Sequence, residues 1–269
     1  MRKWGARLLK DNTPIQEYKI KGRTVFVKRE DLCTEDPMPK LAKLRGAYEL
    51  LVKLKSQRVK KVGHFDTSIS RAGQGIAFIA RELGMEFFLC YPKKKELSDQ
   101  HRIAQELGAI PIEIKPNVTP VCYAVAKREV ESKGGVMIPF GVSCQESIKA
   151  VCREAAHVDN YLFTGTVVLC VGSATIISGI LLHKPEAKII GISAGANNKK
   201  QYQNIRKLLL PIIPGNVRLL PNTIPYTTAD DFECPFPASP YYDLKAFRWL
   251  VEHIDQLEDP ILFYNIGQL

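Results

Sequence analysis

The chain has 269 residues, of which 45% are hydrophobic and 25% charged, as in an ordinary globular protein with one large core or two modest ones. No apolar stretch is long enough to span a bilayer, and the basic start lacks the apolar core of a secretory signal, so neither a membrane-spanning nor a secreted protein is expected. The net charge of +10 indicates phosphate-rich partners such as nucleic acid, but the basic runs are short and do not alternate with aromatic residues, so an ordinary basic protein is favoured.

Strand-like and helix-like stretches alternate through most of the chain. The strands are short continuous apolar runs, and the helices repeat their apolar residues on one side. This combination predicts an α/β fold of three layers, with mostly parallel, twisted sheets covered on both faces. The expected strands are 24–28, 59–65, 86–91, 110–114, 136–140, 166–172 and 187–193, alternating with helices at 43–56, 72–83, 98–107, 120–132, 144–157, 175–183 and 197–209.

The last part of the chain departs from this alternation. Residues 210–240 are rich in proline and turn-forming residues, and we expect a loop there. A helix at 243–257 and a strand at 261–266 are expected to follow. Sheets of this kind bind ligands at the carboxyl ends of their strands, so the chemistry is expected in the loops that join strands to helices.

The seven cysteines are scattered singly and form no Cys-x-x-Cys pair. Most lie in apolar segments, where a thiol behaves as a small hydrophobe. We therefore expect reduced cysteines, no metal site and a cytoplasmic location.

One of these loops has the composition of a phosphate-binding turn. The apolar strand 168–171 leads into Gly172, Ser173, Ala174 and Thr175, and a helix follows. Small residues let backbone N–H groups approach a phosphate, and the helix N-terminus adds a favourable dipole. The segment lacks the endings typical of nucleotide P-loops and dinucleotide sites. These residues alone support a phosphate site and an ordinary tight turn equally.

A lysine near the start of a helix is the second chemical signal. The run Val25-Phe-Val-Lys-Arg-Glu-Asp-Leu is followed, after a loop, by Pro39-Lys-Leu-Ala-Lys-Leu-Arg-Gly. A partly desolvated lysine amine loses its proton readily and can form a Schiff base with an aldehyde cofactor. A solvated surface lysine is the competing interpretation.

In this order the motifs resemble the fold-type-II pyridoxal-phosphate enzymes of the tryptophan synthase β family. The branch of aminocyclopropane-carboxylate deaminase and D-cysteine desulfhydrase is the most similar. The resemblance covers nearly the whole chain and implies an enzyme with pyridoxal 5'-phosphate as its cofactor and a homodimeric state. It implies a large cofactor-binding domain, 1–56 plus 145–269, and a small inserted α/β domain at 57–144.

The resemblance also implies roles for individual residues. The family's Schiff-base lysine falls on Lys43, which would also act as general acid or base. Its phosphate cup falls on the turn at 172–176. Its acidic residue beside the pyridine nitrogen falls on Asp243, for which an N-cap of the last helix is an equally supported role. The other implied residues are Tyr242 as a catalytic group, Ser70, Gln74, Gly172, Ser173, Ala174 and Thr175 as cofactor contacts, and Arg71 and Tyr241 as substrate contacts.

Several of these positions depart from the family pattern. Only Ser70 matches the family's Ser-Asn-His loop, because Arg71 and Ala72 stand in place of the asparagine and histidine. Ala174 and Thr175 replace two glycines of the phosphate cup. Capping, packing or simple exposure would equally account for the polar residues at 70–74 and the tyrosines at 241–242. We expect cofactor binding to survive these changes, whereas the substrate of the deaminase or desulfhydrase does not transfer.

A second resemblance rests on Asp66, Thr67 and Ser70. This pattern is similar to that of pyridoxal-phosphate enzymes in bacteriophage clusters that hypermodify thymine. It implies a lyase acting at the α-carbon of an amino acid attached to a base in DNA, by decarboxylation or by deamination and elimination, in the host cytoplasm. The alternatives are a deaminase or desulfhydrase of a small free amino acid, and a non-catalytic DNA-binding relic of the fold.

Overall fold

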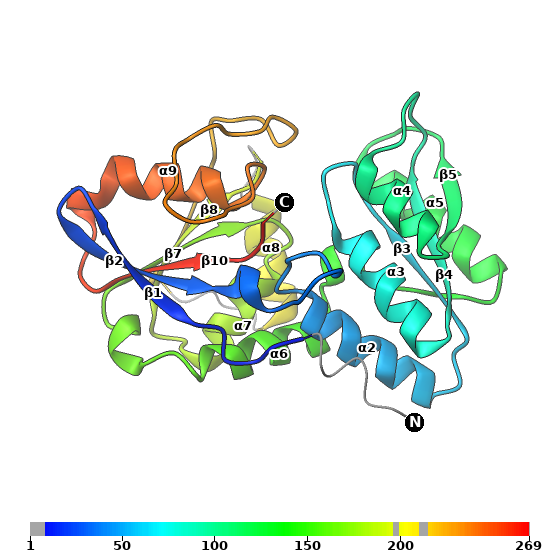
Figure 1. Cartoon of the computed structure of the whole chain (residues 1–269), viewed down its shortest axis with the longest axis horizontal. Helices are drawn as coiled ribbons and strands as arrows, with labels where there is room; N and C mark the ends of the chain where they lie inside the picture. The colour runs from blue at the N-terminus through cyan, green and yellow to red at the C-terminus, as the bar shows by residue number, and fades with distance from the viewer. Residues whose placement is uncertain (1–8, 196–198, 210–214, 269) are drawn as a thin grey trace. The chain divides into compact units, whose positions relative to one another are not determined.

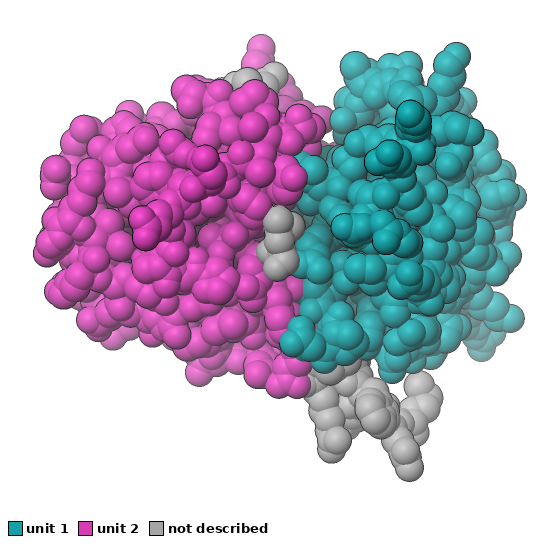
Figure 2. Space-filling model, turned by 45° about the horizontal axis from the view of Figure 1, so that its top comes forward, with its two compact units in different colours: residues 1–9, 36–39, 43–142 teal, residues 10–35, 40–42, 143–269 magenta. Residues whose placement is uncertain are grey.

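The computed structural model describes residues 9–195, 199–209 and 215–268. Contacts within the chain define two compact units, coloured separately in Figure 2. Unit 1 comprises residues 1–9, 36–39 and 43–142, and unit 2 comprises residues 10–35, 40–42 and 143–269. The first two residues of the helix expected at 197–209 lie outside the described residues, as do residues 210–214 of the expected loop.

Unit 2 is built on a six-stranded sheet (Figure 1). The pair β1–β2 is antiparallel, and the other neighbouring strands are parallel. All six residues of β7 are buried, as a central parallel strand covered on both faces requires. In spatial order the strands are β1 (Ile15–Ile20), β2 (Arg23–Arg29), β10 (Ile261–Asn265), β7 (Thr166–Val171), β8 (Lys188–Ser193) and β9 (Val217–Leu220).

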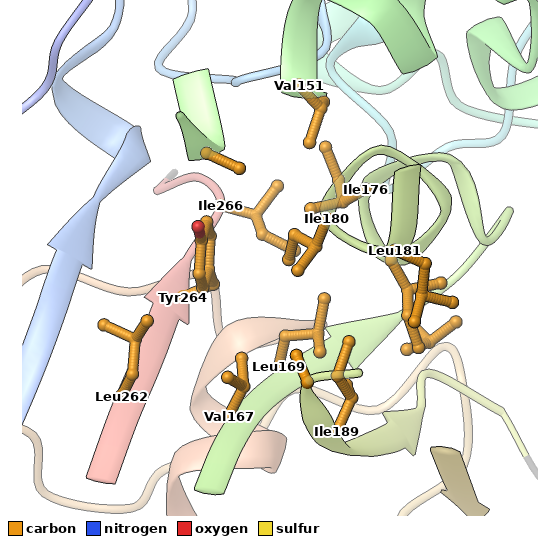
Figure 3. Close-up of a cluster of buried hydrophobic side chains, with 14 of the residues drawn as sticks. Val151, Val167, Leu169, Ile176, Ile180, Leu181, Ile189, Leu262, Tyr264 and Ile266 are labelled. Atoms are coloured by element: carbon orange, nitrogen blue, oxygen red, sulfur yellow. The ribbon is translucent and has the colours of Figure 1, made fainter. Parts of the chain in front are cut away.

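Helices cover both faces of this sheet. On one face, Leu169 of the sheet packs with Ile180 in the apolar cluster of Figure 3. On the other face, Phe247 packs edge-on against Phe263, with ring centroids 5.5 Å apart. The first face is covered by α6 (Gln145–Ala155), α7 (Thr175–His183) and α8 (Lys199–Leu208), and the second by α9 (Asp243–His253).

Unit 1 holds a four-stranded parallel sheet. Helices α2, α3 and α4 pack in succession, and α5 packs so closely that a Cβ on Gly63 would lie 2.4 Å from Val130. Among the described helices of both units, none is long and apolar enough to cross a bilayer. The strands, in spatial order, are β5 (Ile110–Ile114), β4 (Glu86–Pro92), β3 (Lys61–Phe65) and β6 (Val136–Met137), and the helices are α2 (Leu44–Ser56), α3 (Ala72–Leu83), α4 (Asp99–Glu106) and α5 (Thr119–Ser132).

The structure confirms the predicted α/β class with mostly parallel sheets, and two strands were missed. The expected loop at 210–240 contains β9, where buried Val217 and Leu219 alternate with exposed Arg218 and the strand pairs with β8. The many prolines around this short edge strand hid it. Strand β1 was also unexpected, because it is a partly exposed antiparallel edge with little apolar content.

The units differ from the expected domain boundaries in the place of α2. This helix was assigned with residues 1–56 to the large domain, whereas it packs against α3 and lies in unit 1. A side chain at Gly75 of α3 would meet Leu44 of α2 at 2.4 Å, which shows how closely the two helices approach. The functional domain boundaries stay a prediction.

A buried ion pair anchors the segment before β1. Lys28 of β2 and Glu154 of α6 lie 2.7 Å apart, with side chains 0% and 2% exposed. The same carboxylate accepts backbone N–H bonds from Asn12 at 2.8 Å and Thr13 at 2.7 Å. Lys28 also donates to the Thr13 carbonyl at 2.6 Å. Because both charges are fully paired and hydrogen-bonded, the network joins β2, α6 and residues 12–13.

Removing one partner of this pair is expected to destabilise the protein. Lys28→Met leaves the Glu154 carboxylate buried without its cation, which should lower the free energy of unfolding by about 3–5 kcal/mol. The matched control is Lys61→Met, which breaks an exposed pair with Glu86 and should cost less than about 1 kcal/mol. Urea denaturation measures both, and equal losses would contradict the structural role of the buried pair.

Candidate active site

The loop after β7 is a turn of small residues at the N-terminus of α7. Gly172 is exposed, whereas Ala174 is buried and has φ 69° and ψ 6°, in the left-handed region. That conformation costs a non-glycine residue roughly 1–2 kcal/mol, and such strain is often found at functional sites. The family pattern has glycine at position 174, and the backbone conformation gives the reason for it.

Three hydroxyl groups gather at this loop. Thr175 Oγ1 lies 2.9 Å from both Ser143 Oγ and Ser173 Oγ. Asn204 of α8 donates its side-chain amide to the Ser173 carbonyl at 3.4 Å. Hydroxyl groups beside the N-terminus of a helix form a site suited to an anion such as phosphate. The sequence analysis missed Ser143 and Asn204, because no local pattern connects them with the loop.

Gly172 is required neither by backbone conformation nor by packing. Its φ is not positive, and a Cβ built there would meet nothing among the described residues nearer than Tyr242 Cε1, at 3.9 Å. At Gly191 of β8, by contrast, a Cβ would lie 2.6 Å from Leu219. A glycine without a structural requirement fits the close approach of a ligand to the backbone.

Tyr242 lies beside this loop. Its hydroxyl is 2.7 Å from that of Tyr226, and the two rings meet edge-on with centroids 5.9 Å apart. Tyr241 is half-buried. The structure thus brings Tyr242 and Gly172 together, as the predicted site requires, and adds Tyr226, which the sequence analysis did not select.

Asp243 is a buried acid at the start of α9. Its Oδ1 accepts the backbone N–H of Ile266 at 3.1 Å. Burial raises its pKa to about 7, and nearby Asp31 also raises it, whereas the N–H groups of Ile266 and Gly267 lower it. Tyr242 holds the cap position of α9, so Asp243 is not the N-cap that we considered. The carboxylate binds the end of β10 instead.

The segment that leads into Lys43 is fixed at the same place. The Ala42 N–H donates to the Ile266 carbonyl at 3.0 Å, and Leu41 forms a bridge with Gly267. Lys43 follows directly, and its carbonyl accepts the Ala47 N–H at 3.0 Å as α2 begins. The residues before Lys43 are therefore held by the same dipeptide that binds Asp243.

The predicted residues of α3 form a network at its first turn. Ser70 Oγ accepts the Ala72 N–H at 3.2 Å, which is a capping role. Arg71 Nε donates to Gln74 Oε1 at 3.3 Å. Asp66, at the end of β3, accepts the N–H of Gly73 at 2.6 Å. Ser70 therefore has the capping role that was considered for the polar residues at 70–74, and Asp66 accepts a second N–H of the first turn.

His64 is a buried histidine close to Lys43 and Asp66. Its side chain is on β3, and its Nδ1 has no hydrogen-bond partner among the described residues. Burial lowers the pKa of His64, Asp66 raises it and Lys43 lowers it. The ring is therefore neutral at pH 7. The sequence analysis did not assign it a role, because an isolated histidine carries little signal.

The Lys-Arg-Glu-Asp motif that carried the resemblance has a structural role. Lys28 pairs with Glu154, and Arg29 binds Asp31 through two bonds of 2.9 and 2.7 Å. The motif thereby stabilises unit 2 and places Asp31 where it raises the pKa of Asp243. Its contribution to the site is indirect.

The predicted site residues fall into two groups, one in each unit. The structure shows local contacts within each group, and their joint role in one site stays a prediction. Unit 1 contains Lys43, Ser70, Arg71 and Gln74, and unit 2 contains Gly172, Ser173, Ala174, Thr175, Tyr241, Tyr242 and Asp243.

The chain is similar over its whole length to a known phage enzyme. No family model matches it. It is 29% identical to the glycyl-dTMP PLP-dependent decarboxylase of Pseudomonas phage M6, across 97% of this chain and 100% of that protein. It is 32% identical to the biosynthetic L-threonine dehydratase of Mycobacterium leprae over 45% of this chain, a match that spans 27% of the dehydratase.

Solved structures show the same fold. The crystal structure of a homologue of ACC deaminase matches with a TM-score of 0.78 and 20% identity, over 97% of this chain and 90% of that one. The sequence and the fold of this chain are similar to those of fold-type-II pyridoxal-phosphate enzymes, as the motifs predicted. The phage decarboxylase is a relative that the chain matches along its full length.

The buried Asp243 predicts a specific dependence of stability on pH. Its pKa is about 7 in the folded protein against an ordinary value of 3.8, so the folded state keeps a proton that the unfolded state releases. The contribution of Asp243 to the free energy of unfolding should therefore be greatest below pH 4 and should fall as the pH rises to about 7. The total loss corresponds to about 1.4 kcal/mol for each unit by which the folded pKa exceeds the unfolded one.

Melting temperatures of the cofactor-free protein between pH 4 and 7 test this dependence. Asp243→Asn should remove the downward slope, whereas Asp231→Asn, at a fully exposed side chain, should leave it unchanged. If the melting temperature of Asp243→Asn falls with pH as steeply as that of the wild type, another group causes the pH dependence.

Proposed function

We propose that this protein is a pyridoxal-phosphate-dependent lyase that removes the carboxylate of an amino acid attached to a thymine nucleotide in DNA. The observation that carries the proposal is the similarity, along the entire chain, to a decarboxylase of glycyl-dTMP. The similarity to pyridoxal-phosphate enzymes, in sequence and in fold, makes the protein an enzyme with this cofactor. When bound, the cofactor supplies an electron sink for the bond that breaks at the α-carbon.

The residues of unit 2 fit this cofactor. The turn at 172–175 offers backbone N–H groups, hydroxyls and the N-terminus of α7, which is the donor set that a phosphate requires. No side chain among the described residues fills the space next to the Cα atom of Gly172. Asp243 is a buried acid whose carboxylate could pair with a protonated ring nitrogen, and that cation would counteract the burial that raises the pKa of Asp243. We therefore assign phosphate binding to Gly172–Thr175 and the ring nitrogen to Asp243.

Lys43 would hold the cofactor through its amine. A lysine amine is the group suited to this attachment, because it becomes nucleophilic once its proton is lost. The substrate amine would displace Lys43, which takes up a proton as it is released. Once the carboxylate has left as carbon dioxide, Lys43 Nζ would deliver that proton to the substrate α-carbon. Neutral His64 lies in electrostatic reach of this amine without adding a competing positive charge.

The remaining predicted residues would orient the substrate. Tyr242, whose hydroxyl is bound to Tyr226, would cover the cofactor ring or exchange a proton. Ser70 and Gln74 would lie along the cofactor, while Tyr241 would contact the substrate. Arg71 is a half-buried cation beside α3 and would bind a carboxylate or a phosphate through its planar guanidinium group.

The net positive charge of the chain supports a substrate amino acid that is attached to DNA. The net charge of +10 favours a polyanion over a small free amino acid. We further propose a homodimer, as the family resemblance implies, and a location in the host cytoplasm if a phage encodes the protein. Sedimentation of the loaded enzyme distinguishes a dimer from a monomer.

Replacement of Lys43 tests the proposed attachment. The purified protein with pyridoxal phosphate should absorb in the near-visible range, and borohydride should fix the cofactor to Lys43, as peptide mass mapping can show. Lys43→Ala should lose this attachment and lower the release of carbon dioxide from glycyl-thymidylate DNA by roughly 10²–10⁴-fold. Lys53→Ala, an exposed lysine of α2, is the matched control. Attachment to another lysine would contradict the assignment.

Gly172 provides a test that separates binding from folding. Gly172→Ala should keep the melting temperature, because the new Cβ meets no close neighbour, yet weaken pyridoxal-phosphate binding by about tenfold or more. Gly191→Ala should instead destabilise the fold, since its Cβ would lie 2.6 Å from Leu219. Unchanged cofactor affinity in Gly172→Ala, measured by absorbance titration, would exclude this loop from the phosphate site.

A deaminase of a small free amino acid is the second candidate function. The partial match to a threonine dehydratase, 32% identical over 45% of this chain, favours it. Release of ammonia and a keto acid from free serine or threonine would support this candidate. Release of carbon dioxide from nucleotide-linked glycine, without turnover of free amino acids, would support the decarboxylase.

A further inference from the structure

Unit 1 contains a cavity of about 380 Å³ at the carboxyl ends of β4 and β5. Parallel α/β sheets bind ligands at these strand ends, and none of the residues assigned to the cofactor lines this cavity. The residues that carry the argument are Tyr91, Lys94, Lys95, Ser98, His101 and Glu113.

Two buried polar atoms of the cavity residues have no partner among the described residues. They are Ser98 Oγ and His101 Nε2. Ser98 holds the cap position of α4, yet its hydroxyl makes no cap bond. Buried polar groups are nearly always hydrogen-bonded, so these two atoms, which belong to residues of one cavity, could take partners from a ligand that enters it.

The chemistry of His101 defines what this ligand must offer. Its side chain is 4% exposed and stacks on Tyr91, with ring centroids 4.6 Å apart. Burial lowers its pKa, and the ring is hydrogen-bonded to the backbone of Thr67. The neutral ring donates its one N–H to that carbonyl, so Nε2 is an acceptor. Beside it, the Ser98 hydroxyl can donate, and this pair complements the carbonyl and N–H edge of a pyrimidine such as thymine.

The charges of the cavity favour an anion at its rim. Lys94 and Lys95 line it, and the N-terminus of α4 adds a positive dipole. The acidic residue on the β5 side, Glu113, is paired with Lys93 at 3.1 Å. Glu96 is exposed and also lines the cavity, so the two lysines outnumber the unpaired acid.

The cavity is bonded to the loop that precedes α3. Lys94 Nζ donates to Ser68 Oγ at 2.6 Å, and Gln100 donates to the Ser68 carbonyl at the same distance. Asp66, in the same loop, acts electrostatically on both His64 and His101. The cavity is therefore connected to the loop that leads to Arg71, the predicted substrate residue of unit 1.

We propose that this cavity binds a pyrimidine nucleotide of the substrate, with the phosphate on Lys94 and Lys95 and the base edge on Ser98 and His101. The proposal rests on the proposed function, because it names the part of the enzyme that recognises the nucleotide carrier. The nucleotide is either free or a unit of a DNA strand, since both present the same phosphate and base.

Calorimetric titration of the full chain with dTMP and with a short oligothymidylate tests the proposal. Ser98→Ala and Lys95→Ala should each weaken binding about tenfold, whereas the controls Ser132→Ala and Lys127→Ala should stay within about twofold. Both control side chains are exposed on α5, where Ser132 bonds the Glu129 carbonyl and Lys127 pairs with Glu131. The purine nucleotide dAMP, which lacks the carbonyl and N–H edge, should bind more weakly than dTMP.

The outcomes are distinct from those of the cofactor experiments. Equal binding of dTMP and oligothymidylate assigns the cavity to the nucleotide itself, and binding of the oligonucleotide alone assigns it to a DNA strand. Binding that does not depend on Ser98 and Lys95, or no binding of either probe, overturns the proposal. The absorbance of pyridoxal phosphate attached to Lys43 should be unchanged in Ser98→Ala. Loss of nucleotide binding would therefore not contradict the cofactor site, and loss of cofactor attachment would not contradict the nucleotide site.

Discussion

The hydrogen bond from the Ile266 backbone to the Asp243 carboxylate is the interaction on which the candidate site depends. Ile266 also accepts the N–H of Ala42, directly before Lys43. One residue at the end of β10 thus fixes the start of α9 and the segment that enters α2. Because the carboxyl group is buried, its pKa is raised, and a cationic group beside it would favour the ionised form. Burial of an ionisable group lowers the stability of the fold, and such destabilising features are common at functional sites.

The turn after β7 shows a comparable balance between stability and function. The buried strand β7 ends in a short loop before α7 begins. In this loop Gly172 is exposed, and the backbone of Ala174 adopts the left-handed conformation, which is strained for a residue other than glycine. Neither feature improves packing, since a Cβ at Gly172 would fit without conflict. Hydroxyls from two elements meet at Thr175. Hydroxyl groups and open space beside the N-terminus of a helix suit a bound anion, which is the role proposed for this loop.

The departures from the family at the start of α3 agree with a different substrate. Where the family has Ser-Asn-His, this chain uses Ser70 as a cap and joins Arg71 to Gln74. The neighbouring loop is tied through Ser68 to a basic cavity with unsatisfied polar atoms. A small free amino acid needs no such surface, whereas a nucleotide carrier offers both a phosphate and a hydrogen-bonding base. The charge of the chain points in the same direction.

The sequence by itself determined the order of most elements and the parallel α/β class, because apolar periodicity is a local signal. The residues of the proposed cofactor site were selected by the resemblance to known enzymes, and their roles stay a prediction. It did not determine the edge strand β9, whose pairing with β8 depends on a distant neighbour. Only the tertiary structure showed that Lys28 and Arg29 are buried in ion pairs, that Ser143 meets Thr175, and that Asp243 binds the end of β10. Those contacts join residues far apart in the chain, and burial, which sets the pKa of Asp243, is a property of the folded surroundings rather than of the residue.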